Sequence, residues 1–569
     1  MQPRKDMASQ AHSQTTASSS TSDRKRKRTP NIIVGTSSFD KIIRKNAAVI
    51  DKTMFIKDWM EAPVVVSAVM RPSRFGKSTN LSMLKSFFSL NAQCKNFERF
   101  LIGKETEFIE EHCGQYPVVY MDMKCIRGDN WEQMLSDIWV HLREIMRDQR
   151  HHLDEEDVQY IGVNYLDANA PANEGIAGCF LKFLTSCLYE RHSKRVIVLI
   201  DEYDAPLNHA CREGDEFYEK ASDFFGSFYS NGLKGNPALK KACLMGIVEI
   251  GGYRMLSRLN NLVINSSGDE RYSEYFGFTR EEVSKFLDGD EKRIKDVMAL
   301  YNGHYMGSHQ MINPWSFANY ISRGELKSYW VRASSFDSIR SIISPALNIE
   351  LVEILGKLYD GQEHEIGELY TTVNYMKTAT TTSMLAFLTH TGYLTYKDGK
   401  VSIPNQEIKY AWGDHALGLT GTETVVPAFR QPIMDILGAD QVNIRLLENR
   451  MRAIFSYHDL RSENSYHVFY LAVFIVICGP SKVSSNKESG HRGYDIVIRL
   501  DELKRLFVFE LKLSQKKGDF EKDATEGLRQ IQEKKYYQDQ QFSGWTCFLI
   551  GVAFYKKCMS NLVCEELIL

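Results

Sequence analysis

The chain has 569 residues, 43% of them apolar, and is long enough for two to four domains with hydrophobic cores. This composition excludes a fibrous or intrinsically disordered protein. A formal net charge of −2 excludes overall basicity, so any contact with nucleic acid depends on local patches of charge.

Residues 1–30 are predicted to form a disordered basic tail, because they carry seven Lys/Arg against two Asp and are rich in Ser, Thr and Gln. They lack the apolar segment of a secretory signal. The uninterrupted basic run from Arg24 to Arg28 predicts either nuclear import, with importin as a partner, or a general polyanion-binding arm. We expect a nuclear protein in the first case and a cytoplasmic one otherwise.

Membrane insertion is not expected. The longest apolar stretch near the C-terminus, residues 469–478, is ten residues long, which is too short to cross a bilayer.

A strand, a loop and a helix follow one another early in the chain. Residues 39–60 look helical or irregular, residues 64–69 form an apolar run typical of a buried strand, and residues 79–88 have helical spacing. Between them the loop ends in Gly76-Lys77-Ser78, as a Walker A loop does. In that setting Lys77 would reach the β- and γ-phosphates of ATP, and Ser78 would ligate Mg2+.

The start of this loop departs from the Walker pattern. Arg71 stands where the first glycine is usual, and Pro72 removes one backbone N–H from the phosphate-binding nest. The guanidinium groups of Arg71 and Arg74 would replace part of that stabilisation. The sequence therefore favours nucleotide binding and leaves hydrolysis open.

Further apolar runs at 118–121, 196–200 and 242–248 alternate with helical stretches and predict an α/β domain with a largely parallel sheet. Directly after the second run come Asp201 and Glu202. Asp201 would complete the Mg2+ shell, and Glu202 would polarise the attacking water. A plain strand end is the alternative when this pair is taken alone.

Around residues 340–420 the pattern changes to helices followed by two short strands. Asp398-Gly399 between those strands predicts a tight hairpin turn. Helices with one hairpin suggest a small winged-helix-like module. Two interpretations remain open: nucleic-acid binding, or a connector that packs the main domains together.

A second hairpin is predicted over residues 493–513. If Asp501 to Lys504 form its turn, Leu500 pairs with Arg505 and Asp495 lies opposite Glu510 on the same face. Lys512, two residues beyond Glu510, returns to that face. The opposite face presents a core stripe made of Ile496, Ile498, Phe507, Phe509 and Leu511.

This set of charges suits a metal-dependent phosphodiesterase. Two carboxylates held that close repel each other, so Asp495 and Glu510 would share a cation. All-oxygen ligation favours Mg2+ or Mn2+, which could activate a water, while Lys512 would orient that water or stabilise the pentavalent phosphate. The competing interpretation is a surface hairpin whose charges are solvated.

The eleven cysteines never lie closer than six positions apart, so neither a zinc knuckle nor a Cys-x-x-Cys pair is present. We expect reduced, mostly buried thiols of an intracellular protein.

Several segments together resemble AAA-ATPase-like proteins that carry a C-terminal PD-(D/E)XK nuclease domain, over nearly all of residues 35–555. The residues on which this resemblance rests are Val49–Thr53, Arg71–Ser78, Ile200–Pro206, Leu259–Leu262, Tyr301–Tyr305, Asn313–Ser316, Gly392–Thr395, Ile403–Asn405, Tyr466-His467, Ser485–Gly490, Asp495, Glu510–Lys512, Gln530-Ile531 and Lys535-Tyr536.

The resemblance implies an AAA-ATPase-like P-loop domain at 31–335, a helical, winged-helix-like domain at 336–424 and an α/β nuclease-like domain at 425–569. It implies metal ligation by Asp495 and Glu510. It also adds Glu488 and Gln530 as catalytic candidates and makes the Arg-Pro start of the loop a trait of the family.

Two departures from the family pattern stand out. The usual Gly-Arg-x-Asp reads Arg492-Gly-Tyr-Asp495 here, which moves the arginine by one position, to the other strand face. Glu249 stands where a basic residue is frequent near the γ-phosphate, so Arg254 or Arg258 would have to replace that cation.

Two functional hypotheses follow. The first is an ATP-gated, Mg2+-dependent nuclease acting on DNA or RNA. The second is a catalytically weak, nucleotide-switched nucleic-acid-binding or signalling protein, of the kind found among effectors and mobile elements. The sequence leaves the choice between DNA and RNA, the oligomeric state and the pathway open.

Overall fold

The computed structural model describes residues 32–569 apart from 162–171, 251–257, 331–348, 360, 370–371, 374–379, 420–425, 456–462, 480–481, 485–494, 517, 536, 538–541 and 556–557. The predicted basic tail therefore lies outside the described residues. The fold is α/β, with one large sheet in the first half of the chain and a second at the C-terminus.

The first sheet has five parallel strands in the order β2-β3-β4-β1-β6. They are β1 (Val66–Met70), β2 (Val118–Asp122), β3 (Val196–Asp201), β4 (Leu239–Gly246) and β6 (Leu262–Asn265). The four strands predicted in this part of the chain are confirmed, with ends shifted by up to three residues. Because all five run in one direction, their carboxyl ends meet at one edge of the sheet.

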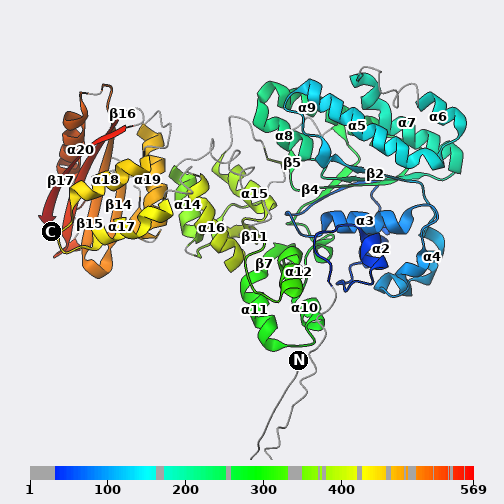
Figure 1. Ribbon diagram of the computed structural model, residues 1–569, viewed down its shortest axis with the longest axis horizontal. Helices are drawn as coiled ribbons and strands as arrows, with labels where there is room; N and C mark the ends of the chain where they lie inside the picture. The colour runs from blue at the N-terminus through cyan, green and yellow to red at the C-terminus, as the bar shows by residue number, and fades with distance from the viewer. Residues whose placement is uncertain are drawn as a thin grey trace, which may run out of the picture.

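Helices cover both faces of this sheet (Figure 1). Strand β1 shows why its apolar run is continuous: Ala68 packs into one core and Val69 into the other. The helices are α1 (Phe39–Arg44), α2 (Met54–Glu61), α3 (Lys77–Phe88), α4 (Thr106–His112), α5 (Trp131–Gln149), α6 (Glu155–Ile161), α7 (Glu174–His192), α8 (Ala205–Glu213) and α9 (Asp215–Leu233).

After the sheet come α10 (Arg280–Phe286), α11 (Glu291–Tyr301), β7 (Asn302–Met306), β8 (His309–Ile312) and α12 (Pro314–Arg323). The middle region, residues 349–419, holds α14 (Ile349–Tyr359), β9 (His364–Glu365), β10 (Thr372–Val373), α15 (Thr381–Thr391), β11 (Thr395–Lys397), β12 (Lys400–Ser402) and α16 (Gln406–Leu419). Asp398 and Gly399 have φ of 49° and 82°, so the predicted tight turn between β11 and β12 is confirmed.

The C-terminal region contains α17 (Val426–Gly438), α18 (Ile444–Phe455), α19 (Glu463–Cys478) and α20 (Phe520–Lys534). Its sheet runs in the order β13 (Val483–Ser484), β14 (Ile496–Leu500), β15 (Arg505–Leu513), β16 (Thr546–Tyr555), β17 (Cys558–Ile568). The β15–β16 pair is parallel, and the others are antiparallel.

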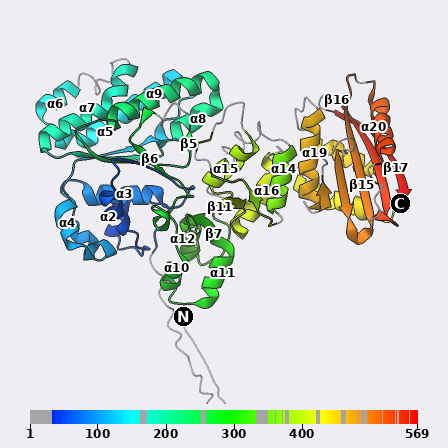
Figure 2. The ribbon, with the colours of Figure 1, turned by 180° about the vertical axis from the view of Figure 1, so that it is seen from behind.

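Helices lie on both faces of this second sheet, with α19 on one side and α20 on the other (Figure 2). The predicted stripe from Ile496 to Leu511 packs in the core that contains α19. Val497 and Val508, on the other face, pack with Ile531 of α20. A solvated surface hairpin is thereby excluded. Helix α19 also packs against α14 and α16 and so joins the sheet to the middle region.

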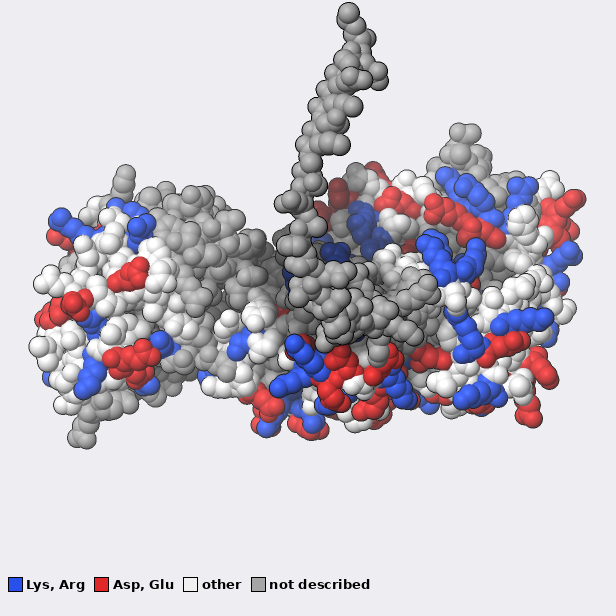
Figure 3. Space-filling view, turned by 60° about the horizontal axis from the view of Figure 1, so that its bottom comes forward, with Lys and Arg blue, Asp and Glu red and all other residues white. Residues whose placement is uncertain are grey.

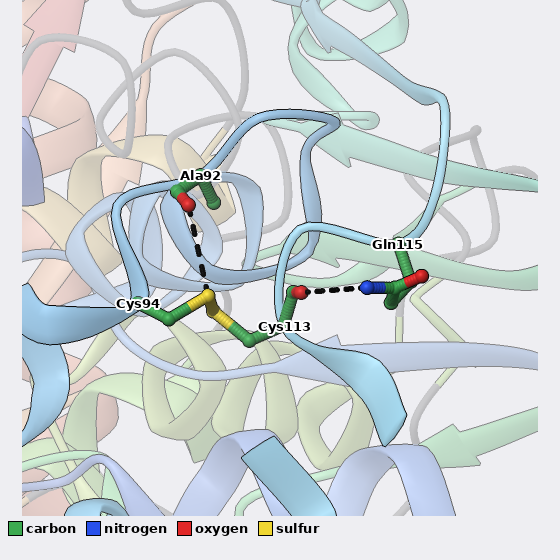
Figure 4. Close-up of a disulfide and its surroundings, with 4 residues drawn as sticks. All are labelled: Ala92, Cys94, Cys113 and Gln115. Carbon is green, nitrogen blue, oxygen red and sulfur yellow. Dashed lines mark hydrogen bonds between the residues drawn. A yellow bond between two sulfur atoms is a disulfide. The ribbon is translucent and has the colours of Figure 1, made fainter. Parts of the chain in front are cut away.

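The cysteine prediction was wrong at one pair. Cys94 and Cys113 form a disulfide with Cα atoms 6.0 Å apart, which joins the short helical turn Cys94–Phe97 to the end of α4 (Figure 4). Sequence spacing did not indicate it, because the two are 19 positions apart and meet only when the chain returns after α4. The other cysteines with described side chains are free thiols.

No helix in the described ranges is long and apolar enough to cross a membrane. On the face shown in Figure 3, Lys and Arg side chains alternate with Asp and Glu over the described residues. This mixture agrees with the net charge of −2.

Candidate functional site

The P-loop joins the end of β1 to the start of α3. Gly76 precedes the helix with φ of 89°, a left-handed conformation that favours glycine, and Lys77 begins the helix. The Lys77 Nζ atom donates to the carbonyl oxygens of Arg71, at 2.9 Å, and Pro72, at 3.1 Å. The ammonium group is thus folded onto the loop itself, where phosphate oxygens could replace the two carbonyls.

Arg71 does not take the place predicted for it at the phosphates. Its guanidinium is fully buried and donates to the carbonyls of Met70, Asn265, Ser266 and Arg271. These contacts fix the loop against the end of β6, and Arg71 does not line the adjacent cavity. The prediction failed because the sequence could not show that β6 would end beside the loop.

The carboxylate of Asp201 meets the P-loop across the sheet edge. Although β4 separates β3 from β1, the Ser78 hydroxyl hydrogen-bonds to Asp201. Burial raises the pKa of Asp201 to about 6, and the Ser78 contact opposes that rise. A buried carboxylate with a raised pKa beside a hydroxyl fits the place of a divalent cation, because a cation would stabilise the ionised form.

Glu202 adopts φ of 50° and lines the cavity beside the loop. Its backbone N–H donates to Asp201 Oδ1 at 3.1 Å. The left-handed turn lets consecutive residues serve different purposes: Asp201 faces Ser78, and Glu202 faces the cavity. Strain of this kind in a non-glycine residue is frequent at functional sites.

Asp204 was missed as a functional candidate. It is fully buried, and its Oδ2 atom accepts the N–H groups of Ile247, at 2.9 Å, and Val248, at 3.2 Å. Burial, followed by the charge of Glu202, raises its pKa to about 6. Asp204 therefore ties the segment after β4 to the turn that carries Glu202. A second acid three residues after Asp201 was the available signal.

A cavity of about 1120 Å3 lies beside the loop. Its wall has a cationic part, which contains Lys77, Arg74, Lys124, Arg127 and Arg212, and an apolar part, which contains Ile32, Val34, Phe278 and Trp315. Gly76 and Ser78 also line it, and the Arg74 guanidinium lies over the Trp315 ring at 4.4 Å. A ligand that joins several negative charges to an aromatic base is complementary to these two parts of the wall.

The middle region supplies another part of the wall, through Phe387, Thr391 and Tyr393, with Trp330 beside them. The Trp330 indole N–H donates to the Ser73 carbonyl of the P-loop at 3.2 Å. The cavity is thus bounded by the middle region as well as by the loop.

Of the two candidate replacements for the cation near the γ-phosphate, the one that the structure describes, Arg258, does not lie at the cavity. Arg258 forms an ion pair with Asp223 of α9, with 2.7 Å between Nη2 and Oδ1, and does not line the cavity. Arg254 lies outside the described residues. Glu249 belongs to the two-residue strand β5 (Glu249–Ile250), which pairs with β10.

In the C-terminal sheet, the predicted hairpin register is confirmed. Leu500 pairs with Arg505 and Ile496 with Phe509, which places Asp495, one residue before β14, opposite Glu510. Asp495 Oδ2 accepts the Leu511 N–H at 2.6 Å, and Lys512 Nζ lies 3.1 Å from Glu510 Oε1.

The surroundings of Glu510 disfavour the ionised form of its carboxyl group. Glu510 is only 3% exposed, and its Oε2 atom is buried with no hydrogen-bond partner among the described residues. Burial, followed by the charge of Asp495, raises the pKa of Glu510 to about 7, and Lys512 opposes the rise. The orphaned oxygen and the opposed acid fit a hard divalent cation, which would satisfy both.

Gln530 lies on the side of α20 away from β17. Ile531 packs into the core under the helix, and Gln532 hydrogen-bonds to Glu565 of β17. Because successive helical residues are about 100° apart, Gln530 lies on the opposite side of Ile531 from Gln532. Gly527, three residues earlier, lets the helix approach Glu510: a Cβ there would lie 3.3 Å from the Glu510 carbonyl oxygen.

Two predicted residues of this site, Glu488 and the displaced Arg492, lie outside the described residues. His467 of α19 was missed as a site residue. Its Nδ1 atom lies 3.8 Å from Asp495 Oδ1. Tyr466-His467 was among the segments that carry the family resemblance, but the sequence did not show that the histidine would meet a carboxylate about thirty positions later, because only the packing of α19 on the sheet joins them.

Two family models match this chain. Residues 33–253 match the family described as a predicted AAA-ATPase, and residues 461–562 match the PD-(D/E)XK nuclease superfamily. These matches confirm the two kinds of domain, AAA-ATPase-like and PD-(D/E)XK nuclease, that the sequence resemblance implied. The chain thus combines an AAA-ATPase-like P-loop domain with a C-terminal PD-(D/E)XK domain.

Two individual proteins are similar to this chain at low sequence identity. An uncharacterized protein in the vnfD 5′ region of Azotobacter chroococcum is 24% identical over 395 residues, which cover 64% of this chain and 70% of that protein. A Walker-type ATPase of Pyrococcus abyssi, PABY2304, aligns with 64% of this chain and 95% of its own, at 13% identity and a TM-score of 0.35.

Proposed function

We propose that this protein binds ATP in the cavity beside the P-loop and that the nucleotide state controls a divalent-metal-dependent nuclease site at Asp495, Glu510 and Lys512. The observation that carries the proposal is Glu510. Its Oε2 atom has no hydrogen-bond partner among the described residues, and the carboxylate lies opposite a second acid and 3.1 Å from a lysine. Burying such a charge costs free energy unless a cation binds there.

In the nucleotide site, Lys77 would leave its two carbonyl partners for phosphate oxygens, and Ser78 and Asp201 would hold Mg2+. Glu202, which lines the cavity, would orient the attacking water. Arg74, Lys124, Arg127 and Arg212 supply the remaining positive charge along the wall. The cavity can thus neutralise a triphosphate without Arg71.

In the nuclease site, Asp495 and Glu510 would hold Mg2+ or Mn2+. When bound, such a cation lowers the pKa of a water and neutralises charge on the phosphoryl group. Lys512 is 21% exposed at its side chain, so its ammonium group can reach a phosphodiester oxygen while it stays beside Glu510. DNA or RNA is the substrate class, because the phosphodiester linkage is what these groups act on.

Contacts between the two sites support control by nucleotide. Trp330 touches the P-loop and packs on Tyr393 with ring centroids 4.8 Å apart, and Trp412 of α16 donates to the Tyr393 carbonyl at 3.1 Å. Helix α16 packs against α19, which lies on the nuclease sheet. A change at Ser73 therefore has a packed route towards the second site.

The test is cleavage of labelled single- and double-stranded DNA and RNA with Mg2+ or Mn2+, each with and without ATP. We expect Asp495→Ala, Glu510→Ala and Lys512→Ala to lower the rate by orders of magnitude. The matched control is Glu502→Ala, which removes an exposed acid from the turn of the same hairpin and should leave the rate unchanged.

Undiminished cleavage by all three site variants would contradict the proposal. Binding of ATP and nucleic acid without cleavage under either metal would instead support the second hypothesis, a nucleotide-switched binding protein.

We further propose that the basic tail directs nuclear import through importin. Fusion of residues 1–31 to a fluorescent protein tests this, with Arg24 to Arg28 changed to alanine as the control. Cytoplasmic fluorescence of the unaltered fusion would contradict the proposal.

A further inference from the structure

The two carboxylate oxygens of Asp495 have different surroundings. Oδ2 accepts the Leu511 N–H at 2.6 Å, which ties it to β15. Oδ1 is turned towards α19, where it lies 3.8 Å from His467 Nδ1. The carboxylate is therefore bounded on one side by the strand that carries Glu510 and on the other by the imidazole ring.

His467 is itself held firmly in place. It is only 9% exposed, and its neighbour Tyr466 stacks on Phe554 of β16 with ring centroids 4.5 Å apart. One turn further along α19, Tyr470 packs on the same Phe554 ring, and its hydroxyl donates to the Met451 carbonyl. The helical turn that presents His467 is thus fixed to the sheet.

We propose that His467 is a positioning residue for Asp495, which holds the carboxylate in the orientation in which Asp495 and Glu510 would share a divalent cation. This rests on the proposed metal site. Asp495 stands just before β14, outside its paired residues. Among the described contacts, Leu511 holds Oδ2 and His467 bounds Oδ1, so loss of the imidazole would remove the restraint on the Oδ1 side of the carboxylate.

A positioning role predicts a particular metal dependence. Groups that orient a metal ligand change affinity by about 10- to 100-fold when they are removed. Because His467 would act through Asp495 rather than on the ion, its loss should lower the affinities for Mg2+ and Mn2+ by a similar factor. A histidine that ligated the ion directly would instead favour Mn2+, since imidazole suits transition metals better than it suits Mg2+.

The experiment measures Mn2+ binding to the full-length protein without nucleotide, by electron paramagnetic resonance of the free ion, with Mg2+ affinity obtained by competition. Glu510→Ala defines the component of binding that belongs to this site. The test variants are His467→Ala and His467→Asn, whose amide can occupy the place of Nδ1. The matched control is His112→Ala, because His112 is also 9% exposed but hydrogen-bonds to Tyr116, in the first half of the chain.

We expect His467→Ala to lower the affinities for both metals by about 10- to 100-fold. His467→Asn should recover most of that loss, and His112→Ala should bind both metals as the wild type does. In the cleavage assay, His467→Ala should lower kcat at limiting Mn2+ and recover at high Mn2+, with the KM for nucleic acid unchanged.

Unchanged affinity in His467→Ala would overturn the positioning role. So would a loss of Mn2+ affinity alone, which would make His467 a ligand. If the wild type shows no Mn2+ binding that Glu510→Ala removes, the proposed metal site itself fails.

Discussion

Glu510 should make the metal-free protein less stable as the pH rises. An ordinary glutamate has a pKa of about 4.3, whereas burial and Asp495 raise the pKa of Glu510 to about 7. Between those values the unfolded chain releases a proton that the folded chain keeps, so the free energy of unfolding falls with increasing pH. Above about pH 7 the fall is complete.

The size of the effect follows from linkage. The difference between the two pKa values corresponds to about 3 to 4 kcal/mol, of which about 2 to 3 kcal/mol lies between pH 5 and pH 8. Glu510→Gln has no proton to lose there. We therefore expect the variant to gain about that much stability relative to the wild type between these two pH values.

Urea unfolding of the wild type and Glu510→Gln at pH 5, 6, 7 and 8, without nucleotide, measures the difference. The matched control is Glu502→Gln, an exposed glutamate of the same hairpin, which should follow the wild type. Added Mn2+ should stabilise the wild type at pH 8 and leave Glu510→Gln much less affected, because only the wild type offers a carboxylate at this position. Parallel pH profiles for the wild type and the variant, or equal stabilisation of both by Mn2+, would refute this account of Glu510.

Three further predictions concern packing and the nucleotide site. Gly551→Ala should destabilise the C-terminal sheet by roughly 1 to 3 kcal/mol or more, since the added Cβ would lie 2.0 Å from a backbone oxygen of α20; a denaturant midpoint equal to the wild type's would contradict this. Arg71→Ala should lower both thermal stability and ATP affinity because it leaves buried carbonyls without donors, whereas Lys77→Ala should lose ATP affinity in equilibrium binding at nearly unchanged Tm. Equal Tm values for these two variants would argue against a structural Arg71. Glu407→Ala should lower the free energy of unfolding by about 2 to 5 kcal/mol, because it leaves two buried N–H groups, those of residues 329 and 330, unsatisfied. An unchanged midpoint in urea unfolding would contradict this expectation.

Local patterns in the sequence determined much of the architecture. Four of the five parallel strands and the second hairpin followed from apolar runs and turn residues, whose effects operate over a few positions. The register that sets Asp495 opposite Glu510 needed only the length of the turn, because each strand alternates its side chains with a period of two. The Gly76-Lys77-Ser78 end of the P-loop was likewise readable from its own residues.

Contacts between distant segments were decided only by the tertiary structure. Arg71 became a structural residue because β6, almost 200 positions later, ends beside it and offers carbonyl oxygens. The Cys94–Cys113 disulfide depends in the same way on the return of the chain after α4. His467 meets Asp495 only because α19 packs on the second sheet. Side-chain chemistry and local spacing are written in the sequence, whereas the partner of a buried charge is chosen by whichever backbone the folded chain brings beside it.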